Sequence, residues 1–165
     1  MNELTCLLLI SAVVFLGGLN LNFIIKTLIR NKHRESLKEQ FDKTNLLILP
    51  LYQKDGKYNF VVDTGSTCNL IKPKLLRKLV HTKYKCDTET VIASGESISG
   101  GEVANIMFAS PSGEVFVEDF IILDGLDAAL KSTEKELGEK VAGILGTDFL
   151  RHYSKILDFN NCTIE

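Results

Sequence analysis

Apolar residues occur in two different patterns along this 165-residue chain. The first pattern is an almost unbroken apolar run from Leu4 to Ile29. A helix of about 20 apolar residues can cross a bilayer, so this run predicts a transmembrane helix. A core helix is the alternative, but the run has no polar face and it precedes the remaining pattern. We therefore expect a membrane anchor in residues 1–30, followed by a charged spacer in residues 31–44.

A cleaved signal peptide is the rival interpretation of the same run. Its amino end, Met1–Glu3, carries no Lys or Arg, and no A-x-A-like cleavage site follows the run. Basic residues instead occur at the other end, at Lys26, Arg30, Lys32 and Arg34. By the positive-inside rule such a flank stays in the cytoplasm. We therefore expect a single-pass membrane protein whose remaining chain is cytoplasmic.

The second pattern begins near residue 45, where short β-branched and aromatic runs alternate with turn residues, as is typical of strands. The expected strands are Leu46–Leu51, Tyr58–Asp63, Cys68–Ile71, Thr88–Ala93, Val103–Phe108, Val115–Leu123 and Lys155–Phe159. Pro73 suits the start of a helix, because four apolar residues after it share one face. The charged stretch 124–140 breaks the pattern, and we interpret it as a surface insertion with a short helix. Residues 45–165 are thus expected to form one mostly β domain.

Composition and charge argue against several classes of function. The formal net charge is −2, and the basic residues are scattered apart from the flank of the apolar run, so no nucleic-acid partner is expected. The four cysteines include no C-x-x-C pair and the three histidines are dispersed, so neither a disulfide framework nor a zinc site is expected. We predict no metal and no cofactor.

The candidate chemistry lies where the second expected strand ends. There, Asp63 follows the apolar run Phe60–Val62 and precedes Thr64, Gly65 and Ser66. Gly65 allows another segment to approach the backbone closely, and the hydroxyl groups can hold the carboxylate by hydrogen bonds. An Asx-type turn that only ends a strand is the alternative interpretation, and the Asp-Thr-Gly tripeptide alone does not decide between the two.

A second motif near the C-terminus favours an active site. In it, two apolar residues precede a glycine and a short expected helix; the motif residues are Ile144, Leu145, Gly146 and Asp148. Together with the Asp-Thr-Gly turn, this motif resembles the single-domain, retroviral-type aspartic proteases (retropepsins). The resemblance is greatest to their cellular and bacterial relatives, which often carry Leu-Gly-x-Asp-x-Leu at this place. It extends over residues 45–165.

The resemblance implies a fold and a role for each motif residue. The fold would be a closed, β-barrel-like retropepsin fold with one or two short helices, here preceded by the membrane helix. Asp63 would be the catalytic residue. Thr64 would brace two such turns against each other, and Gly65 would present its backbone to the substrate. The second motif would support the site from behind.

The same resemblance implies a lid and a partner chain. The glycine-rich turn with Gly95, Gly100 and Gly101 would be the flap that closes over bound peptide. Hydrolysis without a metal needs two nearby carboxylates that share a proton, and this chain has one Asp-Thr-Gly. We therefore expect a homodimer that cleaves peptide or protein substrates. The alternatives are an inactive retropepsin-like module that binds peptide or dimerises, and a membrane-anchored structural adaptor.

Overall fold

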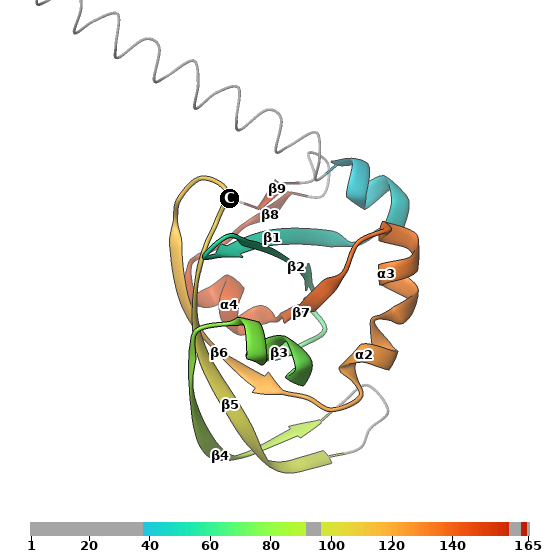
Figure 1. The fold of residues 1–165 in the computed structure, drawn as a ribbon. Coiled ribbons are helices and arrows are strands. Elements are labelled where there is room, and N and C mark those ends of the chain that lie inside the picture. Colours follow the sequence, from blue (N-terminus) through green and yellow to red (C-terminus); the bar gives the residue numbers. More distant parts are fainter. Residues whose placement is uncertain (1–37, 92–96, 159–162, 165) are drawn as a thin grey trace, which may run out of the picture.

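The computed structural model describes residues 38–91, 97–158 and 163–164 (Figure 1). Its elements are β1 (Leu47–Gln53), β2 (Gly56–Val62), β3 (Leu70–Ile71), the 3₁₀ helix η1 (Pro73–Lys78), β4 (His81–Val91), β5 (Ser97–Ala109), β6 (Val115–Ile122), α2 (Leu126–Ala129), α3 (Lys131–Leu137), β7 (Val141–Leu145), α4 (Thr147–His152), β8 (Leu157–Asp158) and β9 (Thr163–Ile164). Residues 38–44 are also helical. The prediction of a mostly β domain is confirmed, although the described part has more short helices than the expected one or two.

Six strands close into a barrel. They follow the order β1-β2-β7-β3-β6-β5, and β1 then pairs with β5 through Tyr52 and Ala109, which completes the ring. β4 extends the sheet beyond β5 and lies outside the ring. Closure gives the ring strands a neighbour on both sides, so few backbone groups are left at open edges. The predicted closed, barrel-like fold is therefore confirmed.

Aromatic rings fill the barrel. Phe60 meets Phe108 and Phe120 with ring centroids 5.3 and 5.4 Å apart, and Phe108 and Phe120 lie 5.9 Å from each other. Phe116 and Phe149 meet at 5.1 Å and join β6 to α4. These separations are those of favourable edge-to-face and tilted pairs. Because loss of a buried Phe side chain typically costs about 3–5 kcal/mol, these rings supply much of the stability of the barrel.

The charged stretch 124–140 is helical, as predicted, but it is more than a surface insertion because three of its leucines are buried. It forms α2 and α3, which follow one another along one side of the barrel, with β7 beside α3 (Figure 1). Three buried leucines of this stretch pack in a second hydrophobic cluster with Ile48 and Val61: Leu126 in α2, Leu137 in α3, and Leu130 between the two helices. The charged residues outnumber the leucines, which concealed an apolar face with helical spacing.

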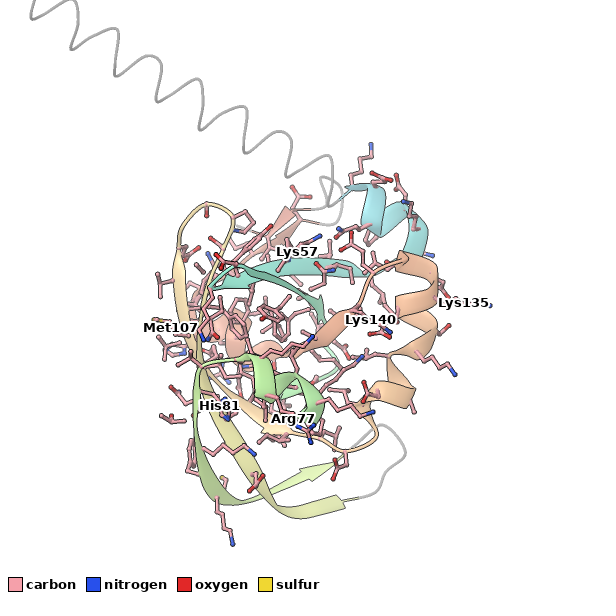
Figure 2. The ribbon with its side chains drawn as sticks, viewed as in Figure 1. Lys57, Arg77, His81, Met107, Lys135 and Lys140 are labelled. Carbon is pink, nitrogen blue, oxygen red and sulfur yellow. The ribbon has the colours of Figure 1, made fainter. Side chains whose placement is uncertain are left out.

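A buried ion pair attaches α3 to the barrel. Lys72 Nζ lies 2.8 Å from Glu134 Oε1, and the two side chains are 7% and 13% exposed. The Val141 N–H also donates to Glu134 Oε1 at 3.0 Å. Lys140, which is labelled on this side of the domain in Figure 2, donates to Glu134 Oε2 at 3.1 Å. Glu134 therefore connects α3 to the first residue of β7.

This ion pair predicts a loss of stability in acid. Burial raises the pKa of Glu134, but the hydrogen bonds from Lys72, Val141 and Lys140 outweigh it and lower the pKa from 4.5 to about 2. The folded-state pKa is depressed, so the stabilisation is present above pH 4.5 and is lost as the pH falls toward about 2. A shift of this size corresponds to roughly 3 kcal/mol at neutral pH.

The variant Glu134→Gln should therefore unfold at a lower temperature than the parent at pH 7, and this difference should shrink between pH 4.5 and pH 2. Thermal unfolding followed by circular dichroism measures it. Glu136→Gln, on the exposed side of the same helix, is the matched control and should show little difference at any pH. A gap between parent and Glu134→Gln that stays constant down to pH 2 would contradict the assignment.

The helical residues 38–44 pack against the domain. Gln40 and Thr44 are buried, Phe41 contacts the main hydrophobic core, and Thr44 Oγ1 donates to the Gln40 carbonyl oxygen at 2.8 Å. The part of the predicted spacer that the structure describes is thus attached to the barrel. The predicted anchor in residues 1–30 lies outside the described residues. No helix in the ranges 38–91, 97–158 and 163–164 is both long and apolar enough to span a bilayer.

β4 and β5 form a long hairpin that extends past the barrel (Figure 1). Because β5 begins at Ser97, Gly100 and Gly101 lie within a strand and not at the tip of the hairpin, where the sequence placed them. Gly101 pairs with Cys86, beside a bulge in β4. A Cβ at Gly101 would make only ordinary van der Waals contact, and its φ is not left-handed, so no turn requires glycine there. Gly95 lies outside the described residues.

Candidate active site

β2 and β7 bring the two sequence motifs together. The strands pair in parallel, with Val62 opposite Leu145. Parallel strands end at the same edge of a sheet, so Asp63 and Gly146, which follow them, are neighbours. The Asp63 N–H donates to the Leu145 carbonyl oxygen at 3.0 Å. Leu145 is fully buried and Ile144 is half-buried, which fixes β7 in this position.

The turn after β2 presents an exposed carboxylate. Asp63 is exposed, and its Oδ1 accepts a hydrogen bond from the Gly65 N–H at 2.8 Å. The Ser66 N–H donates to the Asp63 carbonyl oxygen at 3.2 Å and closes the turn. A Cβ at Gly65 would lie 3.1 Å from Asp63 Oδ1, so the glycine leaves room for the carboxylate. Backbone groups of the turn therefore orient the acid.

Ser66 has a different role from the expected one. Its hydroxyl donates to the Cys68 carbonyl oxygen at 2.8 Å, across the turn, and not to the Asp63 carboxylate. The expectation that this hydroxyl holds the carboxylate is therefore wrong, because the backbone N–H of Gly65 holds it. Thr64 is exposed on the same turn. Ser66 therefore stabilises the shape of the turn, while the Asp63 carboxylate stays exposed to solvent.

The first turn of α4 supports the Asp63 turn from behind. The Thr147 N–H donates to the Ser66 carbonyl oxygen at 2.8 Å, and the Asp148 N–H donates to the Thr67 carbonyl oxygen at 3.0 Å. The first N–H groups of a helix have no partner within the helix, so they are free for this contact. The Asp148 side chain is exposed, and Asp148 therefore supports the turn through its backbone.

Two glycines allow the backbones behind the site to approach closely. A Cβ at Gly146 would lie 2.5 Å from the Cys68 carbonyl oxygen and 2.8 Å from that of Ser66. A Cβ at Gly143 would overlap the Leu70 carbonyl oxygen. The φ of Gly146 is −89°, which any residue adopts. Close approach between segments, and not backbone conformation, therefore requires glycine at these positions.

A chain of polar side chains, not predicted from the sequence, lies beneath the site. Asn69 is 2% exposed, and its Oδ1 accepts a hydrogen bond from the Gly146 N–H at 3.0 Å. Asn69 Nδ2 donates to Glu118 Oε2 at 2.8 Å, and His152 Nδ1 lies 2.6 Å from Glu118 Oε1. The sequence held a signal for Glu118: strand alternation puts it on the same face as the phenylalanines two residues before and after it. An inward carboxylate needs buried partners.

Cys68 is the thiol next to the turn, and it is half-buried. Burial raises the pKa of Cys68, which disfavours the nucleophilic thiolate. Packing therefore explains this residue better than chemistry. Over the described ranges, no three His, Cys, Asp or Glu side chains form a group that could hold a metal ion.

Comparison with known families identifies the class of protein. A family model described as aspartyl protease matches residues 49–149, a stretch that contains both the Asp63 turn and the Gly146 turn. The chain therefore belongs to the aspartyl protease family and is an aspartic endopeptidase with a closed, retropepsin-like barrel.

Comparison with individual proteins finds a distant structural similarity. The fold is similar to that of the EIAV protease complexed with the inhibitor HBY-793, with a TM-score of 0.46 and 16% sequence identity. That match covers 69% of this chain and 91% of the viral one. No curated protein matches the chain.

Proposed function

We propose that this protein is a membrane-anchored aspartic endopeptidase in which Asp63 of each of two identical chains activates a water molecule. The observation that carries the proposal is the exposed Asp63 carboxylate at the end of β2. Its turn is fixed by its own backbone and by the first turn of α4. A rigid turn that presents one acid to solvent is one half of a two-carboxylate site.

The proposed reaction needs one proton shared by two facing Asp63 carboxylates, because like charges at close range do not both stay ionised. The ionised carboxylate takes a proton from water as the water oxygen bonds to the peptide carbonyl carbon. The protonated carboxylate gives its proton to the carbonyl oxygen. The tetrahedral intermediate then collapses as the C–N bond breaks. The leaving nitrogen takes the proton that the first carboxylate received from water, and a hydroxyl group of the intermediate returns its proton to the second carboxylate as the new carbonyl forms. No covalent bond to the protein forms.

A homodimer is the arrangement that supplies the second acid. A two-fold axis makes each chain contribute the same turn, so one Asp-Thr-Gly per chain suffices. The end of the chain offers a surface for pairing: β8 and β9 form a separate two-stranded sheet, in which Leu157 pairs with Ile164. An outer edge of such a sheet has backbone groups that can pair with a second chain. We propose that residues 161–165 contribute to this interface.

The substrate that fits such a site is an extended peptide or an unfolded protein segment. A transition-state mimic of the statine type, whose hydroxyl group stands for the attacking water, should bind the active dimer and stop cleavage. Isothermal titration of the domain with such a mimic tests the proposal. Absence of both binding and cleavage of a denatured-protein mixture would favour the alternative, an inactive peptide-binding or dimerisation module.

We further propose that the apolar run Leu4–Ile29 keeps the protease on the membrane, with the domain in the cytoplasm. This orientation is supported by the basic residues that follow the run and by the lack of Lys or Arg at its amino end. Alkaline phosphatase fused after Glu165 should be inactive, because this enzyme becomes active only after export. A fused fluorescent protein should instead be bright and sediment with membranes. High phosphatase activity would overturn the cytoplasmic orientation.

A further inference from the structure

One buried carboxylate has no part in the proposed reaction. Glu118 lies on β6 with its side chain 8% exposed. Each of its oxygens has a partner: Oε2 accepts from Asn69 Nδ2 at 2.8 Å, and Oε1 lies 2.6 Å from His152 Nδ1. Removing a carboxylate from water is costly unless such partners compensate for the lost hydration. Its place among the polar groups beneath the site indicates a role there.

Asn69 transmits this interaction to the Gly146 turn. Its Oδ1 accepts the Gly146 N–H, a group that can only donate, so its NH₂ group must face Glu118. The same NH₂ group also lies 3.2 Å from the Asp119 carbonyl oxygen. Asn69 therefore needs acceptors on its NH₂ side. The Glu118 carboxylate satisfies that need and fixes the orientation of the amide.

His152 extends the contact to the other end of α4. It is the last residue of α4, while Gly146 is the residue before the first. The His152 side chain is 64% exposed, so one of the two partners of Glu118 is in contact with solvent. Glu118 thus contacts the last residue of α4 directly and reaches the residue before the first through Asn69. The first amide groups of this helix hold the turn of Asp63.

We propose that Glu118 is a positioning residue for catalysis: acting through Asn69, it holds α4 and the Gly146 turn in register with the Asp63 turn. The proposal rests on the proposed function, in which Asp63 is the catalytic acid. If Asn69 loses this partner, the Gly146 N–H loses a fixed acceptor and the support of the Asp63 turn shifts. A displacement of about 1 Å in a catalytic group can cost about a hundredfold in rate.

Reversing the donor and the acceptor tests this role. Asn69→Asp replaces the donating NH₂ group with an oxygen, which then faces the Glu118 carboxylate. We expect kcat to fall between about tenfold and a hundredfold, with a smaller change in KM. Adding Glu118→Gln restores a donor–acceptor pair in the reverse direction, and kcat of the double variant should recover most of the loss. Glu118→Gln alone keeps an acceptor for Asn69 and should have a mild effect.

The chain contains a matched control for this experiment. Asn105 Nδ2 donates to Asp119 Oδ1 at 2.8 Å, so Asn105→Asp creates the same pair of facing carboxylates on the exposed side of the sheet. It should leave kcat unchanged. Equal losses of kcat in Asn105→Asp and Asn69→Asp, or no recovery in the double variant, would overturn the positioning role.

Amide hydrogen exchange at Gly146 provides a readout that does not need activity. Exchange should accelerate in Asn69→Asp and slow again in the double variant. If Asn69→Asp does not fold, the double variant and Glu118→Gln still test the positioning role. A double variant with fast Gly146 exchange or low kcat would contradict the proposal. If the parent protein shows no proteolysis but the variants show these changes in exchange, the proposed function is refuted. The contacts of Glu118 and Asn69 with the Gly146 turn would still be supported.

Discussion

Replacing Asp63 by asparagine should abolish proteolysis while leaving the fold intact. Both carboxylates of the proposed dimer are lost, and loss of a general acid or base typically costs between about a hundredfold and ten-thousandfold in rate. The side chain is exposed, and an asparagine oxygen can still accept the Gly65 N–H. Stability should therefore change by no more than about 0.5 kcal/mol. Cleavage of a denatured-protein mixture, followed by mass spectrometry, measures the loss.

The matched control for this variant is Asp55→Asn. Asp55 is also exposed and lies in the tight turn between β1 and β2. It should retain full activity. The statine-type mimic should bind the parent and Asp55→Asn but not Asp63→Asn. Cleavage that survives in Asp63→Asn at the rate of the parent would show that another residue performs the chemistry.

An excess of Asp63→Asn chains should inactivate the wild-type protein by forming mixed dimers. With nine variant chains to each wild-type chain, random pairing leaves about one wild-type chain in ten with a wild-type partner. Activity per wild-type chain should then fall about tenfold. Differently tagged chains, mixed and allowed to exchange before the assay, measure this effect. Asp55→Asn chains in the same excess should not lower the activity per chain.

Dilution provides the complementary measurement for the soluble domain. Activity per chain should fall once the concentration is below the dissociation constant of the proposed dimer, because each monomer would then have only one of the two acids. Activity per chain that stays constant where sedimentation shows monomers would contradict the shared site. On a membrane, two anchored chains would meet at a higher effective concentration, so pairing there should be tighter than in solution.

Local sequence patterns predicted the strands, and the resemblance of the two motifs to retropepsins implied the barrel and the meeting of these motifs. Short β-branched runs separated by turns indicated the strands, and the residues at Asp63 and Gly146 carried the family resemblance. Their contact follows from parallel pairing of β2 and β7. These are features in which the residue type nearly determines the local geometry.

Other parts of the site could not be predicted in the same way. The partner of the Ser66 hydroxyl is decided by a small difference in distance within one turn, which sequence does not specify. The contacts of Glu118 with Asn69 and His152 join residues that are far apart along the chain. In residues 124–140, the number of charges concealed the spacing of the leucines. Tertiary contacts determine these details, and a single sequence gives little information about them.

The position of β7 between β2 and β3 affects how the chain folds during its synthesis. The two strands that flank the Asp63 turn are made early in translation, but the strand that joins them is made near the end. A ribosome-bound chain that ends before β7 therefore cannot close the barrel or fix the turn. Pairings between such distant segments also form slowly, because long loops must close first. Synthesis itself thus delays completion of the active-site turn until almost the whole domain has emerged.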